Sequence, residues 1–265
     1  CFQGKKKMFP ELFRIGPFSV KTYGVLVAAG FITALLYLMK RAEKEGISRE
    51  LTADTALYLM ISGIIGARAM YVALNWDFYR NNLSEVFSIW SGGLVFYGGF
   101  IAAVITGVVY LRLKKTSILR FADILAPAIF LGMAFGRLGC FFAGCCYGKP
   151  CGLPWAVTFN NPLTFAARGE PLHPTQIYEA LFCAALFWAL DVFNRGRIFR
   201  KNFDGEVFFV SVVVYGIWRF FVEFLRGDDR GARLFGLFPS QFLSIIGIIV
   251  SLGVIIYLWQ KKSGK

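Results

Sequence analysis

Residues 207–225 read VFFVSVVVYGIWRFFVEFL, an apolar run that one arginine and one glutamate interrupt. A run of about 20 apolar residues matches the hydrocarbon thickness of a bilayer. In lipid such a run must be helical, because a helix pairs its backbone amides within the segment. The run therefore predicts a transmembrane helix, and its two charged residues each need a partner or a purpose.

Similar runs recur along the whole chain. They cover residues 20–39, 53–74, 92–111, 124–142, 177–192, 207–225 and 242–259. The composition agrees, since 57% of the residues are hydrophobic and only 17% are charged, and the mean hydropathy is +0.57, well above that of an ordinary soluble domain. We expect an all-α integral membrane protein with seven transmembrane helices in a single polytopic domain, residues 8–265. The fifth run is the weakest, because Pro174 opens it and Asp191 closes it early.

Basic residues gather behind every second span, which predicts the orientation of the chain. Lysine and arginine in short loops are retained on the cytoplasmic side. The N-terminus is therefore expected outside and the C-terminus in the cytoplasm, with an outer loop at about residues 146–175. The net charge of +13 suits anionic lipid headgroups, because the basic residues form no single patch with interleaved aromatics of the kind that binds nucleic acid. The basic clusters are Lys40, Arg41, Lys44 and Arg49; Arg112, Lys114, Lys115 and Arg120; Arg195, Arg197, Arg200 and Lys201; and Lys261, Lys262 and Lys265.

The first residues need separate treatment. Cys1, Phe2, Gln3 and Gly4 resemble the remnant of an engineered protease site, and residues 1–7 are expected to form a tail outside the fold. No cleavable signal peptide is recognisable, so the first span is expected to direct membrane insertion itself.

Arginine occurs inside three of the predicted spans, as Arg68, Arg137 and Arg219. Arg68 and Arg137 lie among small residues, which let a neighbouring helix or a ligand approach the backbone. In the sixth span the spacing of i, i+4, i+8 and i+11 places four polar residues on one helical face. These are Tyr215, Arg219, Glu223 and Arg226.

That polar face has two interpretations. One is a structural ion pair, Arg219 with Glu223, which joins two helices. The other is a cavity lined by guanidinium groups, which bind phosphate bidentately and do not lose their charge. Two arginines against one acid would leave net positive charge for an anion, and Arg137 would add to it if its helix lies alongside.

Three motifs occur in a fixed order, GGLVFYGG at 92–99, GRLG at 136–139 followed by Gly144 and Gly148, and HPTQIYE at 173–179. In this order the chain resembles the prolipoprotein diacylglyceryl transferases. The resemblance covers nearly the whole chain, including Tyr23, residues 123–127 and 215–226, and Gln241.

The resemblance implies a bacterial inner-membrane enzyme with its site toward the outer leaflet. It would transfer diacylglycerol from phosphatidylglycerol to the lipobox cysteine of a prolipoprotein, forming a thioether and releasing glycerol phosphate. No metal or cofactor is implied. Guanidinium groups would stabilise the charge that develops on the leaving phosphate. Arg137 and Arg219 match essential arginines, and Tyr97 lies at a position implicated in catalysis. The expected lipid-binding residues are Arg137, Arg219, Arg226, Glu223, Tyr23, Arg68, Gly98, Gly99 and Gly148.

The chain departs from the family at Tyr97, where many members carry a histidine proposed as the general base. A tyrosine has an ordinary pKa near 10 and is a poor base, so a direct role and a packing role both stay open. His173 is the only histidine, but it precedes Pro174, a favoured first helical residue, and is expected to be structural. Gln176 and Glu179 are expected to hold loops.

Four cysteines form a second departure, namely Cys140, Cys145, Cys146 and Cys151. Many relatives have Asn and Glu in place of the first two. Zinc binding, a disulfide between Cys146 and Cys151 on an oxidising exterior, and a thiol relay in catalysis stay open, although the separated Cys-x-x-Cys pairs of common zinc sites are missing. Cys183 is expected to pack between helices.

Three other functions compete with the lipid transferase. An organic-anion transporter would also place arginines within spans, but it would need a path through the membrane and usually shows an internal repeat. A family paralogue could use another lipid or acceptor. A phosphatidyltransferase of the CDP-alcohol type is disfavoured, because its metal-binding aspartate motif is missing.

Overall fold

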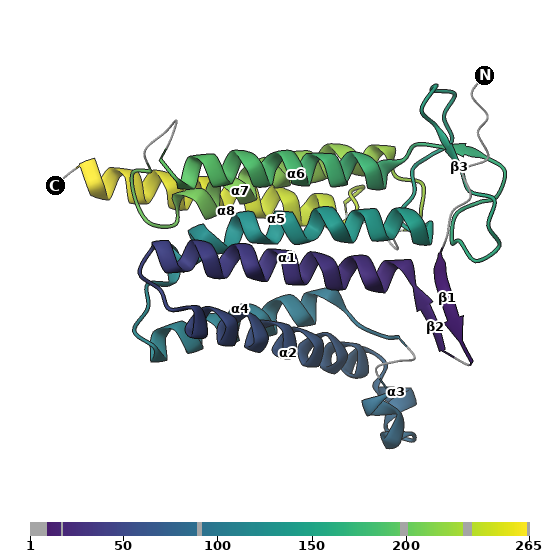
Figure 1. The fold of residues 1–265 in the computed structure, drawn as a ribbon, viewed down its shortest axis with the longest axis horizontal. Helices are drawn as coiled ribbons and strands as arrows, with labels where there is room; N and C mark the ends of the chain where they lie inside the picture. Colours follow the sequence, from purple (N-terminus) through teal and green to yellow (C-terminus); the bar gives the residue numbers. More distant parts are fainter. Residues whose placement is uncertain (1–9, 17, 89–91, 197–200, 230–234, 264–265) are drawn as a thin grey trace. The chain divides into compact units, whose positions relative to one another are not determined.

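The computed structural model describes residues 10–16, 18–88, 92–196, 201–229 and 235–263 (Figure 1). The suspected protease remnant at residues 1–4 lies outside these residues, as do Arg197, Arg200 and Lys265 of the basic clusters. The predicted orientation of the termini remains a prediction.

The described residues contain seven helices long and apolar enough to cross a membrane. This confirms the predicted all-α membrane fold. They are α1 (Thr22–Lys44), α2 (Arg49–Leu74), α4 (Phe96–Leu113), α5 (Ile118–Ala143), α6 (Thr175–Asn194), α7 (Glu206–Val222), which a short 3₁₀ turn η3 (Glu223–Leu225) extends, and α8 (Pro239–Ser263).

Three predicted boundaries were wrong for identifiable reasons. The third span begins at Phe96 rather than at residue 92, because Gly92 and Gly93 have φ angles of +89° and +74°, which a right-handed helix does not allow. Helix α6 begins after Pro174, which occupies the cap position rather than the first turn. It also continues past Asp191, whose carboxylate accepts hydrogen bonds from Tyr37 and Arg195 at 2.6 and 3.0 Å.

The chain forms two compact units. Unit 2 covers Leu38–Phe121, and unit 1 covers Cys1–Tyr37 together with Ala122–Lys265. Within unit 2, helices α2 and α4 pack closely and are joined through the short helix α3 (Trp76–Tyr79) and the 3₁₀ turn η1 (Leu83–Phe87).

Unit 1 holds helices α5 to α8 and the first part of α1. A hairpin of β1 (Glu11–Ile15) and β2 (Phe18–Lys21) leads into α1. Helices α5, α6 and α7 share a buried apolar core that includes Phe130, Leu186 and Val207. This core fixes the three helices that carry the site.

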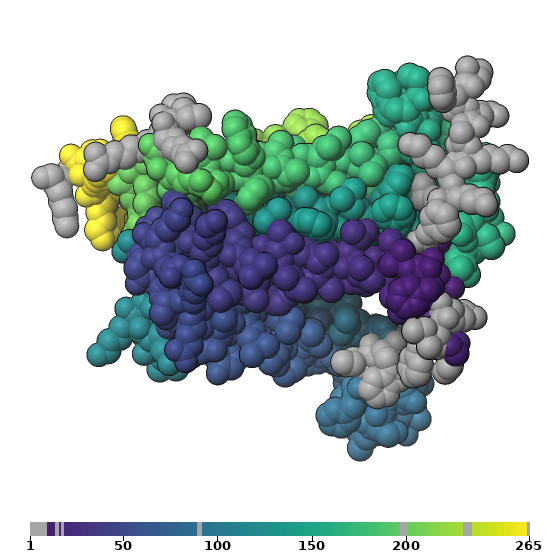
Figure 2. All heavy atoms as spheres, in the orientation of Figure 1, coloured from purple at the N-terminus to yellow at the C-terminus, as the bar shows by residue number. Residues whose placement is uncertain are grey.

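A long loop joins α5 to α6 and has its own small core. Strands β3 (Val157–Thr158) and β4 (Pro171–Leu172) pair antiparallel within it, and Phe159, Ala166 and Leu172 are buried together. The loop forms a lobe at the end of unit 1 where α5 ends and α6 begins (Figures 1 and 2). The first residues of this loop lie beside the charged site.

Candidate active site

The centre of the site is the carboxylate of Glu179, in the second turn of α6. Its oxygens lie 3.1 Å from Arg137 Nη1, 3.5 Å from Arg219 Nη1 and 3.6 Å from Arg226 Nη1. The Glu179 side chain is completely buried. Arginines from α5, from α7 and from the segment after η3 therefore meet one acid inside unit 1, and we call these four residues the arginine cluster.

The expectation that Glu179 holds a loop is wrong, because its carboxylate pairs with three arginines. An unpaired carboxylate within a membrane span costs about 3 kcal/mol, as an unpaired arginine does. Applied to α6, the same argument that singled out Arg137 and Arg219 would have found Glu179. Its neighbour Gln176 does hold a loop, because its side-chain amide donates to the Cys145 carbonyl at 2.7 Å.

Two further acids accompany the arginines. Arg219 forms the predicted ion pair with Glu223 at 2.6 Å. Arg226 forms a two-pronged pair with Asp228 at 2.9 and 2.7 Å. Three arginines thus face three carboxylates, and the predicted excess of positive charge is wrong. A bound phosphate must therefore compete with carboxylates for the guanidinium groups.

Arg226 reaches the cluster by a different route from the one predicted. Helix α7 ends at Val222, the 3₁₀ turn η3 follows, and Arg226 is in extended conformation. It therefore does not continue a helical face; the turn carries it to Glu179. Burial lowers the pKa of Arg226, but hydrogen bonds to Asp228 and Cys146 outweigh this and raise it, so the group stays charged.

The three arginine side chains differ in their solvent exposure. The Arg137 side chain is 19% exposed, that of Arg219 is 10% exposed and that of Arg226 is 1% exposed. Arg137 is therefore the guanidinium most accessible to a ligand, whereas Arg226 is enclosed.

The backbone around Gly148 holds Arg226 in place. Gly148 forms an antiparallel bridge with Arg226, and its amide donates to the His173 carbonyl at 3.0 Å. A Cβ at this position would lie 2.5 Å from His173 Cβ and 2.9 Å from the Leu225 carbonyl oxygen. The structure therefore gives Gly148 a positioning role, because only glycine lets the three segments come this close.

His173 serves the same loop, as expected of a structural histidine. Its amide donates to the Lys149 carbonyl at 3.0 Å. Its ring Nδ1 lies 3.3 Å from the Tyr178 hydroxyl oxygen, and that hydroxyl accepts from Trp155 Nε1 at 2.8 Å.

Tyr23 lies beside the arginine cluster, near the start of α1. Its ring carbon Cδ2 is 3.1 Å from the place where a Cβ on Gly139 would stand. Its hydroxyl interacts electrostatically with Arg137 and Cys140. The glycine in the GRLG motif therefore makes room for this tyrosine.

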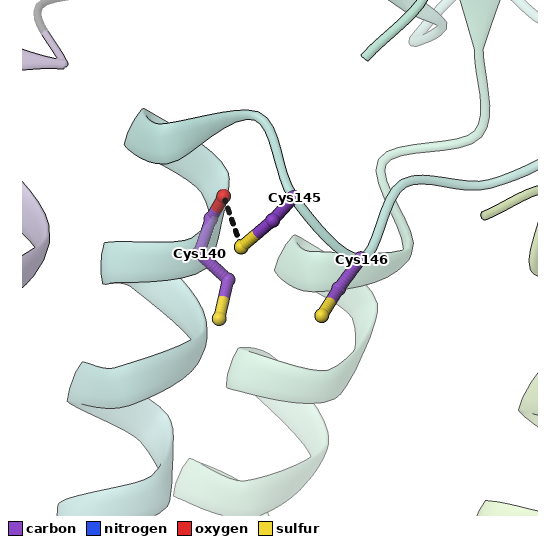
Figure 3. A group of neighbouring side chains, drawn as sticks. All are labelled: Cys140, Cys145 and Cys146. Atoms are coloured by element: carbon purple, nitrogen blue, oxygen red, sulfur yellow. Dashed lines mark hydrogen bonds between the residues drawn. The ribbon is translucent and has the colours of Figure 1, made fainter. Parts of the chain in front are cut away.

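Three cysteines border the arginines. The Sγ atoms of Cys140, Cys145 and Cys146 lie within 4.8 Å of one another and turn toward a common space (Figure 3). Hydrogen bonds with Cys140 and Cys145, aided by Arg226, lower the pKa of the Cys146 thiol. Cys146 and Cys151 are both free, so the disulfide suggested from the sequence does not form in this structure.

The remaining predicted site residues belong to unit 2, where Arg68 organises a loop. Its guanidinium donates to the carbonyls of Glu85, Val86 and Gly92 at 2.6, 2.8 and 2.8 Å. It also lies 5.4 Å from the ring centroid of Tyr79. Its donors are thus engaged by backbone oxygens, and the structure gives Arg68 a structural role.

Gly98 and Gly99 are occupied by helix packing. A Cβ on Gly98 would lie 2.4 Å from the Gly66 carbonyl oxygen, and one on Gly99 would lie 2.6 Å from that of Gly63. The close approach predicted for these glycines is therefore made by α2. Tyr97 precedes them in the first turn of α4 and is 41% exposed, and its predicted part in catalysis stays a prediction.

Fold and site together define a multi-pass membrane protein that buries three arginines around one glutamate. The profile of the prolipoprotein diacylglyceryl transferase family matches residues 10–257. The chain belongs to this family.

Individual relatives match over almost their full length. A phosphatidylglycerol–prolipoprotein diacylglyceryl transferase from Finegoldia magna is 39% identical over 94% of this chain and 95% of its own. The corresponding protein from Clostridium tetani is 36% identical over 93% of this chain and 96% of its own. One from Listeria monocytogenes serotype 4b is 35% identical over 98% of this chain and 93% of its own.

Proposed function

We propose that this protein transfers the diacylglyceryl group of phosphatidylglycerol to the lipobox cysteine of a prolipoprotein. The names of its relatives give the same lipid donor and the same protein acceptor. The observation that carries the proposal is the meeting of three arginines at the buried Glu179. Fixed guanidinium groups in an apolar interior suit the phosphate of a lipid whose acyl chains stay in the bilayer.

In the proposed reaction the acceptor sulfur attacks the glycerol carbon that carries the phosphate. A carbon–sulfur bond forms, the carbon–oxygen bond breaks, and glycerol phosphate leaves with the electron pair. The thiol proton passes to water or to the leaving phosphate. Because the leaving group gains negative charge, fixed guanidinium groups stabilise the transition state more than the ground state.

The arginines divide this work according to their exposure. Arg137 is the most open and contacts the phosphate. Arg219 and Arg226, each paired with a second acid, hold Glu179 in place and add positive charge behind it. Tyr23, at the edge of the cluster, contacts the glycerol headgroup, and Tyr97 donates a hydrogen bond to the substrate rather than acting as a base.

We place the protein in the bacterial inner membrane with its site toward the outer leaflet. The basic residues behind alternate spans support this orientation. The α5–α6 loop, which borders the arginine cluster, then lies on the outer side, where a prolipoprotein would present its cysteine.

The test is transfer to a lipobox peptide in vesicles that contain phosphatidylglycerol. Mass spectrometry should detect a diacylglyceryl thioether on the peptide cysteine. Arg137→Ala and Arg219→Ala should each lower the rate by about 100-fold or more. Arg49→Ala is the matched control, because Arg49 pairs with Glu43 on an exposed surface.

Two results would contradict the proposal, the first its assigned residues and the second its activity. One is full activity in both cluster variants, which would remove the arginines from the reaction. The other is anion flux across the vesicle membrane without peptide lipidation, which would favour a transporter.

A further inference from the structure

The cysteine cluster, which comprises Cys140, Cys145 and Cys146, has no part in the reaction as derived above. Cys140 lies in the last turn of α5, and the other two lie in the loop that follows. All three are free cysteines, and their sulfurs lie within 4.8 Å of one another (Figure 3). A group of three converging thiols needs an explanation of its own.

The backbone holds the cluster in position. The Cys145 carbonyl accepts from the Gln176 side chain at 2.7 Å, and the Cys146 carbonyl accepts from the Thr175 hydroxyl at 2.8 Å. Both donors are completely buried. Cys146 has a φ angle of +58°, which is rare for a residue other than glycine. Such a conformation, held by its surroundings, is typical of functional positions.

The spacing of the sulfurs fits a metal ion. Tetrahedral zinc with sulfur at about 2.3 Å sets neighbouring thiolates roughly 3.8 Å apart. Sulfurs separated by at most 4.8 Å reach that spacing when each moves by roughly half an ångström, which side-chain rotation supplies. Thiolates are soft ligands and favour zinc over the hard ions magnesium and calcium.

Such a site would be negatively charged, and two arginines border it. Three thiolates around Zn²⁺ carry one net negative charge. The guanidinium of Arg226 interacts with Cys146, and that of Arg137 interacts with Cys140. The cluster therefore borders the arginines that would receive the leaving phosphate.

We propose that Cys140, Cys145 and Cys146 bind Zn²⁺ through three thiolates, and that the fourth coordination position takes the acceptor thiol. The second half of this proposal rests on the proposed function. Three protein ligands with one open position are the usual arrangement of catalytic zinc. A coordinated thiol loses its proton to water at neutral pH without a neighbouring base. Its sulfur then forms the bond to the glycerol carbon while glycerol phosphate departs.

Metal binding is tested first, with the metal alone. The purified full chain is reduced, stripped with a chelator and titrated with Co²⁺, whose thiolate complexes absorb in the near ultraviolet. Zn²⁺ should displace Co²⁺ at a ratio of one per chain. Cys140→Ser, Cys145→Ser and Cys146→Ser should each weaken binding by roughly 100-fold. Cys151→Ser is the matched control and should bind as the unaltered protein does.

The metal site is overturned if the charge-transfer band is missing or survives all three serine variants. It is also overturned if two of these cysteines form a stable disulfide in the protein isolated without reductant. The acceptor role is overturned if chelator-stripped protein transfers diacylglycerol at the full rate. Failure of the proposed function would look different, since the metal would bind normally while no thioether formed.

Discussion

Replacing Glu179 with glutamine removes one charge from the centre of the arginine cluster while almost preserving the shape of the side chain. Breaking a buried ion pair costs about 3–5 kcal/mol, because the remaining charge stays buried without compensation. Arg219 and Arg226 each keep a second carboxylate, at 2.6 and 2.7 Å. The loss therefore falls chiefly on Arg137, and we expect the lower end of the range, about 3 kcal/mol.

Arg137, without this anchor, should no longer hold the phosphate in the geometry of the transition state. Misplacing one guanidinium donor at the developing charge should lower kcat/KM by roughly 100-fold. The assay is transfer to the lipobox peptide, accompanied by thermal unfolding in the same detergent.

The matched control is Glu45→Gln. Glu45 also lies between two arginines, at 3.4 Å from Arg41 and 3.2 Å from Arg120, but its side chain is 21% exposed and belongs to unit 2. Its loss should cost less than about 1 kcal/mol. Wild-type activity and unfolding temperature in the Glu179→Gln variant would refute the reasoning.

Three further predictions follow from packing. Gly148→Ala places a Cβ 2.5 Å from His173 Cβ and should lower the transfer rate at least tenfold by displacing Arg226. The control is Gly152→Ala, whose Cβ meets nothing within 4 Å and which should leave the transfer rate unchanged. Gly98→Ala clashes with the Gly66 carbonyl of α2 at 2.4 Å and should destabilise the protein by about 1–3 kcal/mol, measured as a lower unfolding temperature; an unchanged temperature would contradict the helix contact. Arg68→Ala leaves the carbonyls of Glu85, Val86, Gly92 and Gly93 without their donor. It should lower the unfolding temperature while the folded protein keeps its affinity for phosphatidylglycerol, and a loss of affinity without a loss of stability would restore Arg68 as a lipid ligand.

The apolar runs were enough to predict the seven spans, because bilayer thickness and amide pairing leave few alternatives. The cost of isolated charges in lipid singled out Arg137 and Arg219, but it left open whether their helices meet. The sequence does not show which carboxylates from other helices pair with these arginines. The number of carboxylates facing the arginines depends on how α5, α6 and α7 pack, and this packing cancels the predicted excess of positive charge.

Local backbone geometry was the other source of error. The face expected from Tyr215 to Arg226 assumed a continuous helix, but the chain tightens into a 3₁₀ turn at Glu223. Gly98 and Gly99 could be read as a ligand approach or as a helix contact, and only the position of α2 distinguishes the two. Likewise, the spacing of Cys140, Cys145 and Cys146 matches no common zinc motif, because the turn after α5 rather than a Cys-x-x-Cys pair brings them together.

The most direct test of the central claim compares two lipids that differ only in the headgroup. Binding of phosphatidylglycerol and of diacylglycerol with the same acyl chains is measured in zwitterionic nanodiscs, for the unaltered protein and for Arg137→Gln. If the arginine cluster holds the lipid phosphate, the unaltered protein prefers phosphatidylglycerol by tenfold or more, worth about 1.4 kcal/mol, and Arg137→Gln loses that preference. Equal binding of the two lipids by the unaltered protein, or a preference that survives the substitution, would contradict the claim.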